Sequence, residues 1–235
     1  MSVPDGVAAF RARYRATEIG PRYRGWLHFG FTTCGALTAI GAALAGVRAP
    51  SLLELLAVPF SFLFANAGEY FAHRGPMHHR GRVDIVFQRH TIQHHHFFTH
   101  EAMAYEGSRD FKMVLFPWYM LVYFFAGMAL PVGLLLTLVT TVNVGRLFVA
   151  TTVGYFLLYE WMHFAYHLPP DSAVGRLRAI AALRRHHQAH HDPANMTTHN
   201  FNITFPICDL LFGTIHREAP RAPTLSPDSS SPAPR

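Results

Sequence analysis

The sequence predicts an all-α integral membrane protein with about four transmembrane helices and a cytoplasmic helical cap. Hydrophobic residues make up 50% of the 235 residues and charged residues only 14%, whereas soluble proteins carry about 25% charged residues. The apolar residues are gathered in long runs that each approach or exceed the ~20 residues of a bilayer-spanning helix. Histidines cluster where these runs end. The runs therefore predict membrane spans, and the clusters predict a metal site at the membrane boundary.

The distribution of Lys and Arg predicts the topology of these spans. Of 20 basic residues, five lie in residues 1–25, six in 73–112 and seven in 168–235. By the positive-inside rule these three segments face the cytoplasm, together with both termini and the metal site. The net charge of +6 then reflects topology and contact with anionic lipid. Nucleic acid is not expected as a partner, because no basic stripe or binding motif is present.

The elements before the first histidine cluster form one hairpin. Residues 1–25 are a basic segment with interleaved aromatic residues, which predicts a helix at the membrane surface. A first span is expected from Trp26 to Val47, followed by a turn at 48–50. The second span should extend to about Ala72, where Gly75 and Pro76 break the helix as it leaves the bilayer.

The second hairpin follows a polar loop over 73–112, which carries two histidine clusters. The apolar region from Met113 to His167 could hold two or three spans. Because all clusters must emerge on one face to build one site, an even number is expected. We place a span over 113–130, a turn at 131–133, and a return that ends at His167 with a break near 143–145.

The chain is expected to divide into three parts: the N-terminal interfacial segment 1–25, one membrane domain over 26–216, and a tail. Residues 168–216 should complete the cytoplasmic cap. The tail over 217–235 is rich in Pro and Ser, a composition typical of disorder.

The four clusters contain 11 of the 17 histidines and have spacings typical of metal ligands. Spacings of three or four place two imidazoles on one helix face, where both can reach one ion. A doublet lets the neighbouring ring turn toward a second ion. No cysteine lies in the clusters, which disfavours thiolate zinc and iron–sulfur centres. Many imidazoles with few carboxylates match two iron ions with open positions for O₂.

At these residues the sequence resembles the membrane fatty acid hydroxylase and sterol desaturase superfamily. The stretches that carry the resemblance are His73 to His78, His90 to His96 and His187 to His191, followed by an ending from Asn200 to Thr214. The resemblance is collinear over roughly residues 55–216. The sequence departs from the family pattern at His96, at Asn202, where glycine is usual, and at Cys208, where tryptophan is usual.

The resemblance implies a non-haem di-iron enzyme that uses O₂ to hydroxylate or desaturate a lipid chain. Its substrate would be a fatty acyl, sterol or related lipid, with electrons from a separate donor protein. No catalytic residue is expected beyond the metal ligands, and no site for an organic cofactor. The implied ligands are His73, His78, His79, His90, His94, His95, His163, His167, His187, His190 and His191. Four other histidines could orient ligands or carry protons: His96, His100, His186 and His199.

Two acidic residues within the spans have two possible roles. Glu69 precedes His73 by four residues, and Glu160 precedes His163 by three. Each could accept the second N–H of the nearby ligand from one helical turn deeper. The alternative is an ion pair with an arginine near the interface.

Two other classes of protein compete with the oxidoreductase hypothesis. A metal transporter would place its histidines and acids along a path at mid-membrane, whereas these clusters end the spans. A bis-histidine haem protein would need paired histidines in mid-span. Bound iron per chain and a test for a haem absorption band would separate all three.

Overall fold

A computed structural model describes residues 3–82 and 84–217 of the chain. Within these residues the protein consists of helices and connecting loops, with no strand. Most of the predicted tail over 217–235 lies outside the described residues.

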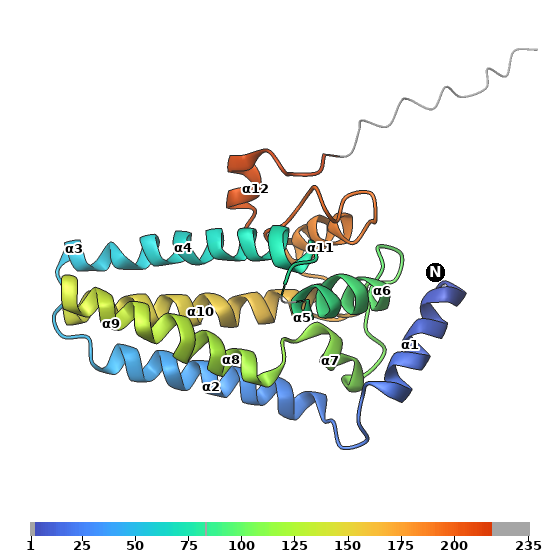
Figure 1. The fold of residues 1–235 in the computed structure, drawn as a ribbon, viewed down its shortest axis with the longest axis horizontal. Helices are drawn as coiled ribbons and strands as arrows, with labels where there is room; N and C mark the ends of the chain where they lie inside the picture. Colours follow the sequence, from blue (N-terminus) through green and yellow to red (C-terminus); the bar gives the residue numbers. More distant parts are fainter. Residues whose placement is uncertain (1–2, 83, 218–235) are drawn as a thin grey trace, which may run out of the picture.

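Four long helical segments run side by side and form the body of the molecule (Figure 1). Each is long and apolar enough to cross a membrane, which makes the chain a multi-pass membrane protein with the four spans that the sequence predicted. The first is α2 (Gly25–Ala45), and the second joins α3 (Leu52–Leu55), α4 (Ala57–Ala72) and the π-helical η1 (His73–Met77). The third joins η3 (Ser108–Asp110), α7 (Phe111–Val114), α8 (Trp118–Phe124), the π-helical η4 (Phe125–Ala129) and α9 (Leu130–Val139), and the fourth is α10 (Val142–Tyr166).

The predicted turn at 131–133 and the predicted break near 143–145 are both wrong. Pro131 lies in the first turn of α9, where its missing N–H costs little because first-turn amides lack partners. The chain turns instead at Thr140 and Thr141, and the Thr141 hydroxyl caps α10 by accepting from the Val144 amide at 3.3 Å. Asn143, the second residue of α10, donates across to the Arg48 carbonyl at 2.9 Å.

α10 lies at the centre of the bundle and packs against α2, α4 and α9. Within its most apolar stretch 61% of the residues are buried, against 11% in each of the other three spans. The outer spans therefore turn most of their apolar surface away from the protein, as expected for helices that face lipid hydrocarbon.

The remaining helices form a cap near one end of the bundle (Figure 1). They are α1 (Asp5–Thr17), α5 (Ile85–Phe87), the π-helical η2 (Gln88–His94), α6 (His95–Phe97), α11 (Arg178–His190) and α12 (Ile207–Phe212). The second and fourth spans end at this cap with one histidine cluster each. The cap helices η2, α6 and α11 carry the other two clusters, so all four lie at this end of the bundle.

The N-terminal helix α1 is attached to the cap through a buried arginine. Arg11 is only 1% exposed, and its guanidinium donates to the carbonyls of Phe97 at 2.8 Å and Ala102 at 2.6 Å. It also pairs with Glu106 at 2.8 Å. A buried guanidinium requires such partners, so α1 is positioned by the loop that follows the second histidine cluster. The sequence did not predict this contact.

Candidate metal centre

Ten of the eleven histidines expected to bind metal meet in the interior of the cap, and all ten are buried. Nine of them form two groups, and within each group the donor nitrogens lie within 4.8 Å of one another. The first group is His73, His78, His90, His95 and His190, and the second is His94, His163, His167 and His187. His191 belongs to neither set, yet its Nε2 lies 3.0 Å from that of His187.

The division between the groups follows from the type of helical turn that holds each histidine. η1 and η2 are π-helical, a form with bonds between residues five apart that occurs often at functional sites. This wider turn places His73 with His78, and His90 with His95. His94 is consequently directed to the second group. The sequence analysis expected the two rings of a doublet to turn to different positions, and His94 and His95 do lie in different groups. The helical spacing of four paired His90 with His94, whereas the structure groups it with His95.

α-Helical spacing accounts for the second group. His163 and His167 lie four residues apart at the end of α10, and their Nε2 atoms are 3.3 Å apart. His187 reaches the same place from α11, with its Nε2 3.3 Å from that of His167. Two helix ends thus deliver three imidazoles to one position, as side chains at i and i+4 share a helix face.

The outer nitrogens of these rings are held by backbone oxygens. A carbonyl can only accept, so in each pair Nδ1 carries the hydrogen and Nε2 keeps a free lone pair directed into the cluster. The pairs are His73 with Phe201 (2.5 Å), His94 with Met113 (2.8 Å), His167 with Met103 (2.7 Å), His190 with His199 (2.9 Å) and His191 with Phe98 (2.5 Å). This arrangement is typical of metal-binding histidines.

The chemistry of these nitrogens fits bound cations. The Thr91 hydroxyl donates to the Met77 carbonyl at 2.6 Å, so it accepts from Nδ1 of His78 at 3.1 Å. His190 also carries its hydrogen on Nδ1, yet the Nε2 atoms of His78 and His190 are only 2.9 Å apart. Two lone pairs at this distance repel each other in a buried site unless a positive charge lies beside them. The donor set therefore fits a metal ion in each group.

Burial also keeps the imidazoles neutral, which is the form that binds metal. Burial lowers the pKa of His94 to about 3. Burial, with smaller contributions from nearby histidines, lowers the pKa of His78 to about 2. The pKa values of His90, His95, His187 and His191 are likewise far below the ordinary value for histidine, with burial as the main cause.

His79 is the one expected ligand that the structure places elsewhere. Its side chain is exposed, and Nδ1 donates to the Arg74 carbonyl at 2.8 Å. The ring turns away because η1 ends before it, so the chain follows a different direction after His78. Among the other histidines, His186 lies 3.4 Å from the carboxylate of Asp209, and His199 contributes only its backbone oxygen, to His190.

Neither proposed role for the two intramembrane glutamates is correct. Glu160 accepts from the Phe116 amide at 3.2 Å. Glu69 accepts from the Thr204 amide at 3.0 Å and also from the Ile203 amide and the Tyr155 hydroxyl. Neither carboxylate accepts from a ligand ring, and neither forms an ion pair with an arginine of the described chain. Each instead accepts from a backbone amide two or three residues after a carbonyl that accepts from a clustered histidine, Phe201 for Glu69 and Met113 for Glu160.

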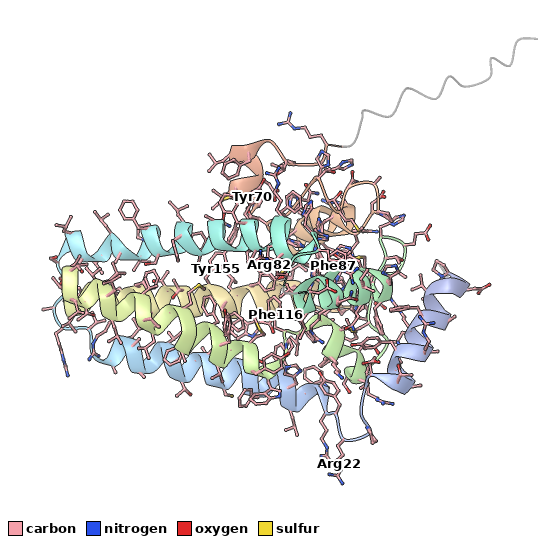
Figure 2. The ribbon with its side chains drawn as sticks, in the orientation of Figure 1. Arg22, Tyr70, Arg82, Phe87, Phe116 and Tyr155 are labelled. Carbon is pink, nitrogen blue, oxygen red and sulfur yellow. The ribbon has the colours of Figure 1, made fainter. Side chains whose placement is uncertain are left out.

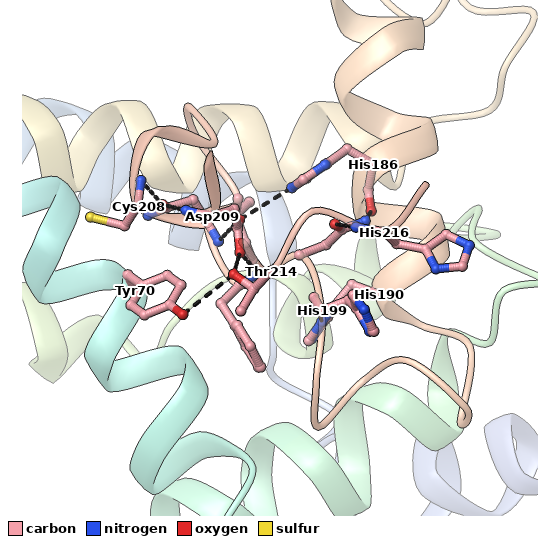
Figure 3. A network of polar contacts seen from close by, with 12 residues as sticks. Tyr70, His186, His190, His199, Cys208, Asp209, Thr214 and His216 are labelled. Carbon is pink, nitrogen blue, oxygen red and sulfur yellow. Dashed lines mark hydrogen bonds and ion pairs between the residues drawn. The ribbon is translucent and has the colours of Figure 1, made fainter. Parts of the chain in front are cut away.

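Asp209 holds the same loop as Glu69, and Figure 3 shows its contacts. Its carboxylate accepts from the amides of Phe201 and Asn202 at 2.9 and 2.8 Å and from the Thr214 hydroxyl at 2.6 Å. Burial raises the pKa of Asp209, but these bonds and His186 outweigh burial and hold it below its ordinary value. The Phe201 carbonyl, which accepts from His73, is therefore held in place by the residues on either side.

Asn202, which stands where the family pattern usually has glycine, makes two hydrogen bonds through its side chain. Its side-chain oxygen accepts from the Cys208 amide at 3.0 Å, and its amide nitrogen donates to the Asn66 carbonyl at 3.0 Å. Asn202 thus links the last loop to α4. The asparagine side chain supplies a bridge that glycine could not.

An apolar cavity of about 330 Å³ lies between α4, α8, η4 and α10 and reaches the first group of histidines at His73. Tyr155 and Phe116 are among its lining residues, and both are labelled in Figure 2. A smaller cavity of about 150 Å³ adjoins it and touches His90, His94 and His163, which come from both groups. Phe116, stacked on Tyr159 with ring centroids 5.2 Å apart, lines both cavities.

Comparison with known proteins gives one family and one related structure. The model of the family described as fatty acid hydroxylase matches residues 58–214, more than half of the chain. The structure of full-length Scs7p, in which only the hydroxylase domain is visible, is similar to this one at a TM-score of 0.56. It shares 21% sequence identity, and the match covers 84% of this chain and 69% of that chain. At this identity the likeness shows a shared fold.

No curated protein matches the chain significantly. The family match nevertheless includes all ten buried histidines of the four clusters and runs from the second span to the loop after α12. The chain belongs to the fatty acid hydroxylase family.

Proposed function

We propose that the protein hydroxylates an unactivated C–H bond of a membrane lipid with O₂. The single observation that supports this most strongly is the pair of adjoining cavities. The apolar one extends between the spans to His73, and the smaller one touches histidines of both groups. In such a reaction a lipid C–H, O₂, two electrons and two protons give the alcohol and water. Two iron ions in the two histidine groups would supply the O₂ activation.

The residues of the chain would hold the ions and present the lipid to them. We assign His73, His78, His90, His95 and His190 to one ion, and His94, His163, His167, His187 and His191 to the other. The backbone carbonyls on Nδ1 would keep each ring aimed inward.

The cavity would align the lipid chain and exclude water. Phe64, Phe124, Phe148 and Phe156 line its deeper part, which favours hydrocarbon over water. The few polar groups of the wall, such as those of Thr152 and Tyr155, face the same space. A lipid chain in this cavity would lie beside His73, which is part of the cavity wall.

Electrons would come from a separate protein. The proposed reaction consumes two electrons for each turnover, which neither the lipid nor O₂ supplies. We propose that the donor docks on the cap, which faces the cytoplasm together with both termini in the predicted topology.

The experiment that tests the function is lipid profiling of cells that express the protein under ¹⁸O₂. Hydroxylation predicts a lipid that gains one ¹⁸O atom. Loss of two hydrogens without oxygen incorporation would identify a desaturase instead.

A pair of adjacent histidines provides matched variants for this experiment. His78→Ala should abolish the product, because it removes a buried ligand from the first group. His79→Ala should leave it unchanged, since His79 is exposed and lies outside both groups. Normal product from the His78 variant, with the protein folded, would exclude the ligand assignment.

A further inference from the structure

We propose that a groove at the beginning of α2 and α8 binds the head group of an anionic lipid and that this lipid is the substrate. The inference deepens the proposed function and rests on it for the identity of the substrate. The groove has a volume of about 950 Å³ and is separate from the cavity between the spans.

Cationic side chains dominate the polar lining of this groove. Arg22, Arg24, Arg89 and Lys112 line it, and no Asp or Glu of the described chain is among the lining residues. None of these four cations forms an ion pair with a described carboxylate. Figure 2 shows Arg22 beside the turn that leads into α2, extending away from the helices.

Arg89 is fixed in position by backbone groups. Its guanidinium donates to the carbonyls of Lys112 at 2.5 Å and Leu115 at 3.3 Å. A neutral partner leaves the positive charge uncompensated, so the guanidinium remains available to a phosphate or carboxylate. Lys112 also donates to a backbone oxygen, that of Glu18.

The apolar lining of the groove indicates a lipid and not a free anion. Trp26 and Trp118 are 62% and 57% exposed, and Leu27 is 67% exposed. Exposed tryptophans beside arginines are typical of the level of lipid head groups. Phe31 packs edge-on against Trp118 with centroids 6.1 Å apart and continues the apolar surface along α2. Dissolved phosphate would gain nothing from this surface.

The groove adjoins the space beside the metal ligands. It shares Arg89, Pro117 and Tyr119 with the 150 Å³ cavity that touches His90, His94 and His163. That cavity in turn adjoins the 330 Å³ cavity between the spans, since Met77, Phe116 and Met120 line both. A head group held at Arg89 would thus place the first carbons of its chain beside the ligands and the remainder between the spans.

Lipid selectivity in vesicles tests this site without requiring turnover. The full-length protein is reconstituted in phosphatidylcholine vesicles, and its association with spin-labelled phosphatidylglycerol is measured against spin-labelled phosphatidylcholine. The test variants are Arg24→Gln, Lys112→Gln and the double variant. The control is Arg178→Gln/Arg185→Gln, which removes two charges from exposed positions of α11.

We expect wild type to prefer the anionic lipid, and each groove substitution to reduce that preference about fivefold, because one cation near the surface contributes about that factor. The α11 control should keep the wild-type preference. An equal reduction in the control, or no preference in wild type, would overturn the site. If the protein prefers the anionic lipid but oxidises no lipid, only the proposed function is rejected. If it oxidises lipid but does not prefer the anionic one, only the head-group site is rejected.

Discussion

At the scale of single residues, the two intramembrane glutamates accept from backbone amides, and neither accepts from a clustered histidine of the described chain. Glu69 holds the amides of Ile203 and Thr204, and the neighbouring Phe201 carbonyl accepts from His73. Glu160 holds the Phe116 amide, three residues after the Met113 carbonyl that accepts from His94. The sequence could place both acids near the site by helical spacing. It could not show their partners, because these come from distant loops.

This arrangement predicts the effect of Glu69→Gln and Glu160→Gln. An amide has one acceptor oxygen in place of two and turns its own N–H groups toward backbone donors, so each variant should lose about 1–3 kcal/mol of stability. Activity per bound metal should remain that of wild type. Thermal unfolding, metal content and turnover measured together check this, with the exposed Glu101→Gln as control. A ~10–100-fold loss of activity per bound metal would indicate direct support of the ligand.

The low pKa values of the ligands predict the pH dependence of metal binding. Since the pKa of His94 is about 3 and that of His78 about 2, the neutral rings persist well below the ordinary value of about 6.5. Co²⁺ affinity, followed by its absorption bands, should therefore change little between about pH 7.5 and about pH 5.5. A steep loss of affinity below about pH 6.5 in a protein that remains folded would contradict the assignment.

The lowered pKa values of His78 and His94 make the stability of the metal-free protein depend on pH, although they leave metal binding nearly independent of it. The unfolded chain takes up protons on these histidines at about pH 6.5, whereas the folded chain does not. The contribution of His78 and His94 to stability is therefore complete above that pH and decreases as the pH falls toward their folded-state values.

At the scale of secondary structure, two glycines determine how α9 packs on α10. A Cβ atom on Gly145 would lie 2.3 Å from the Gly133 carbonyl oxygen, and one on Gly133 would lie 2.4 Å from Val149 Cγ2. Small residues allow helix backbones to approach closely in membranes. This contact also explains the failed turn prediction, since Pro131 and Gly133 suggest a turn locally, whereas here they begin a helix packed against its neighbour.

Alanine substitutions at Gly145 and Gly41 should distinguish the effect of close helix packing on stability from the effect of helix propensity. Gly145→Ala should destabilise the protein by about 1–3 kcal/mol, because the backbone has no room to move. Gly41→Ala, whose new methyl group would meet nothing within 4 Å, should be neutral or gain up to about 1 kcal/mol. Unfolding temperatures of the two variants in one detergent provide the comparison, and equal shifts would show that the close contact is absent.

The π-helical turns are the elements that the sequence could not reveal. Histidine spacing predicted shared faces on α-helices, which holds for His163 and His167. In η1 and η2 the register widens, so His78 joins His73 and His95 joins His90. Local propensity does not distinguish the two registers, because the wider turn is stabilised by the surrounding cap.

At the scale of the whole molecule, apolar length alone left two or three spans open over residues 113–167. The four crossings could be predicted by adding the requirement that all four histidine clusters emerge on one face. The attachment of α1 through Arg11 could not, because its partners, Phe97 and Ala102, are backbone carbonyls nearly 90 residues away. Backbone contacts of this kind leave no pattern in side-chain chemistry.

The predicted sidedness can be tested with introduced cysteines in a Cys34→Ser background, in which the buried Cys208 remains. Gly6→Cys, Gly107→Cys and Ser226→Cys should all react with a membrane-impermeant thiol reagent from the cytoplasmic side, since arginine-rich segments remain there. Ser51→Cys, at the N-cap of α3, should react only from the other side, because α3 lies at the end of the bundle away from the cap (Figure 1). Opposite sidedness of positions 6 and 107 would contradict the four-span topology.

The central claim, that the two histidine groups each hold one iron ion, is tested most directly by the iron content of the purified protein. The account predicts two iron ions per chain, without a haem absorption band. A protein that is folded and active in lipid oxidation but carries one iron or fewer per chain would contradict it.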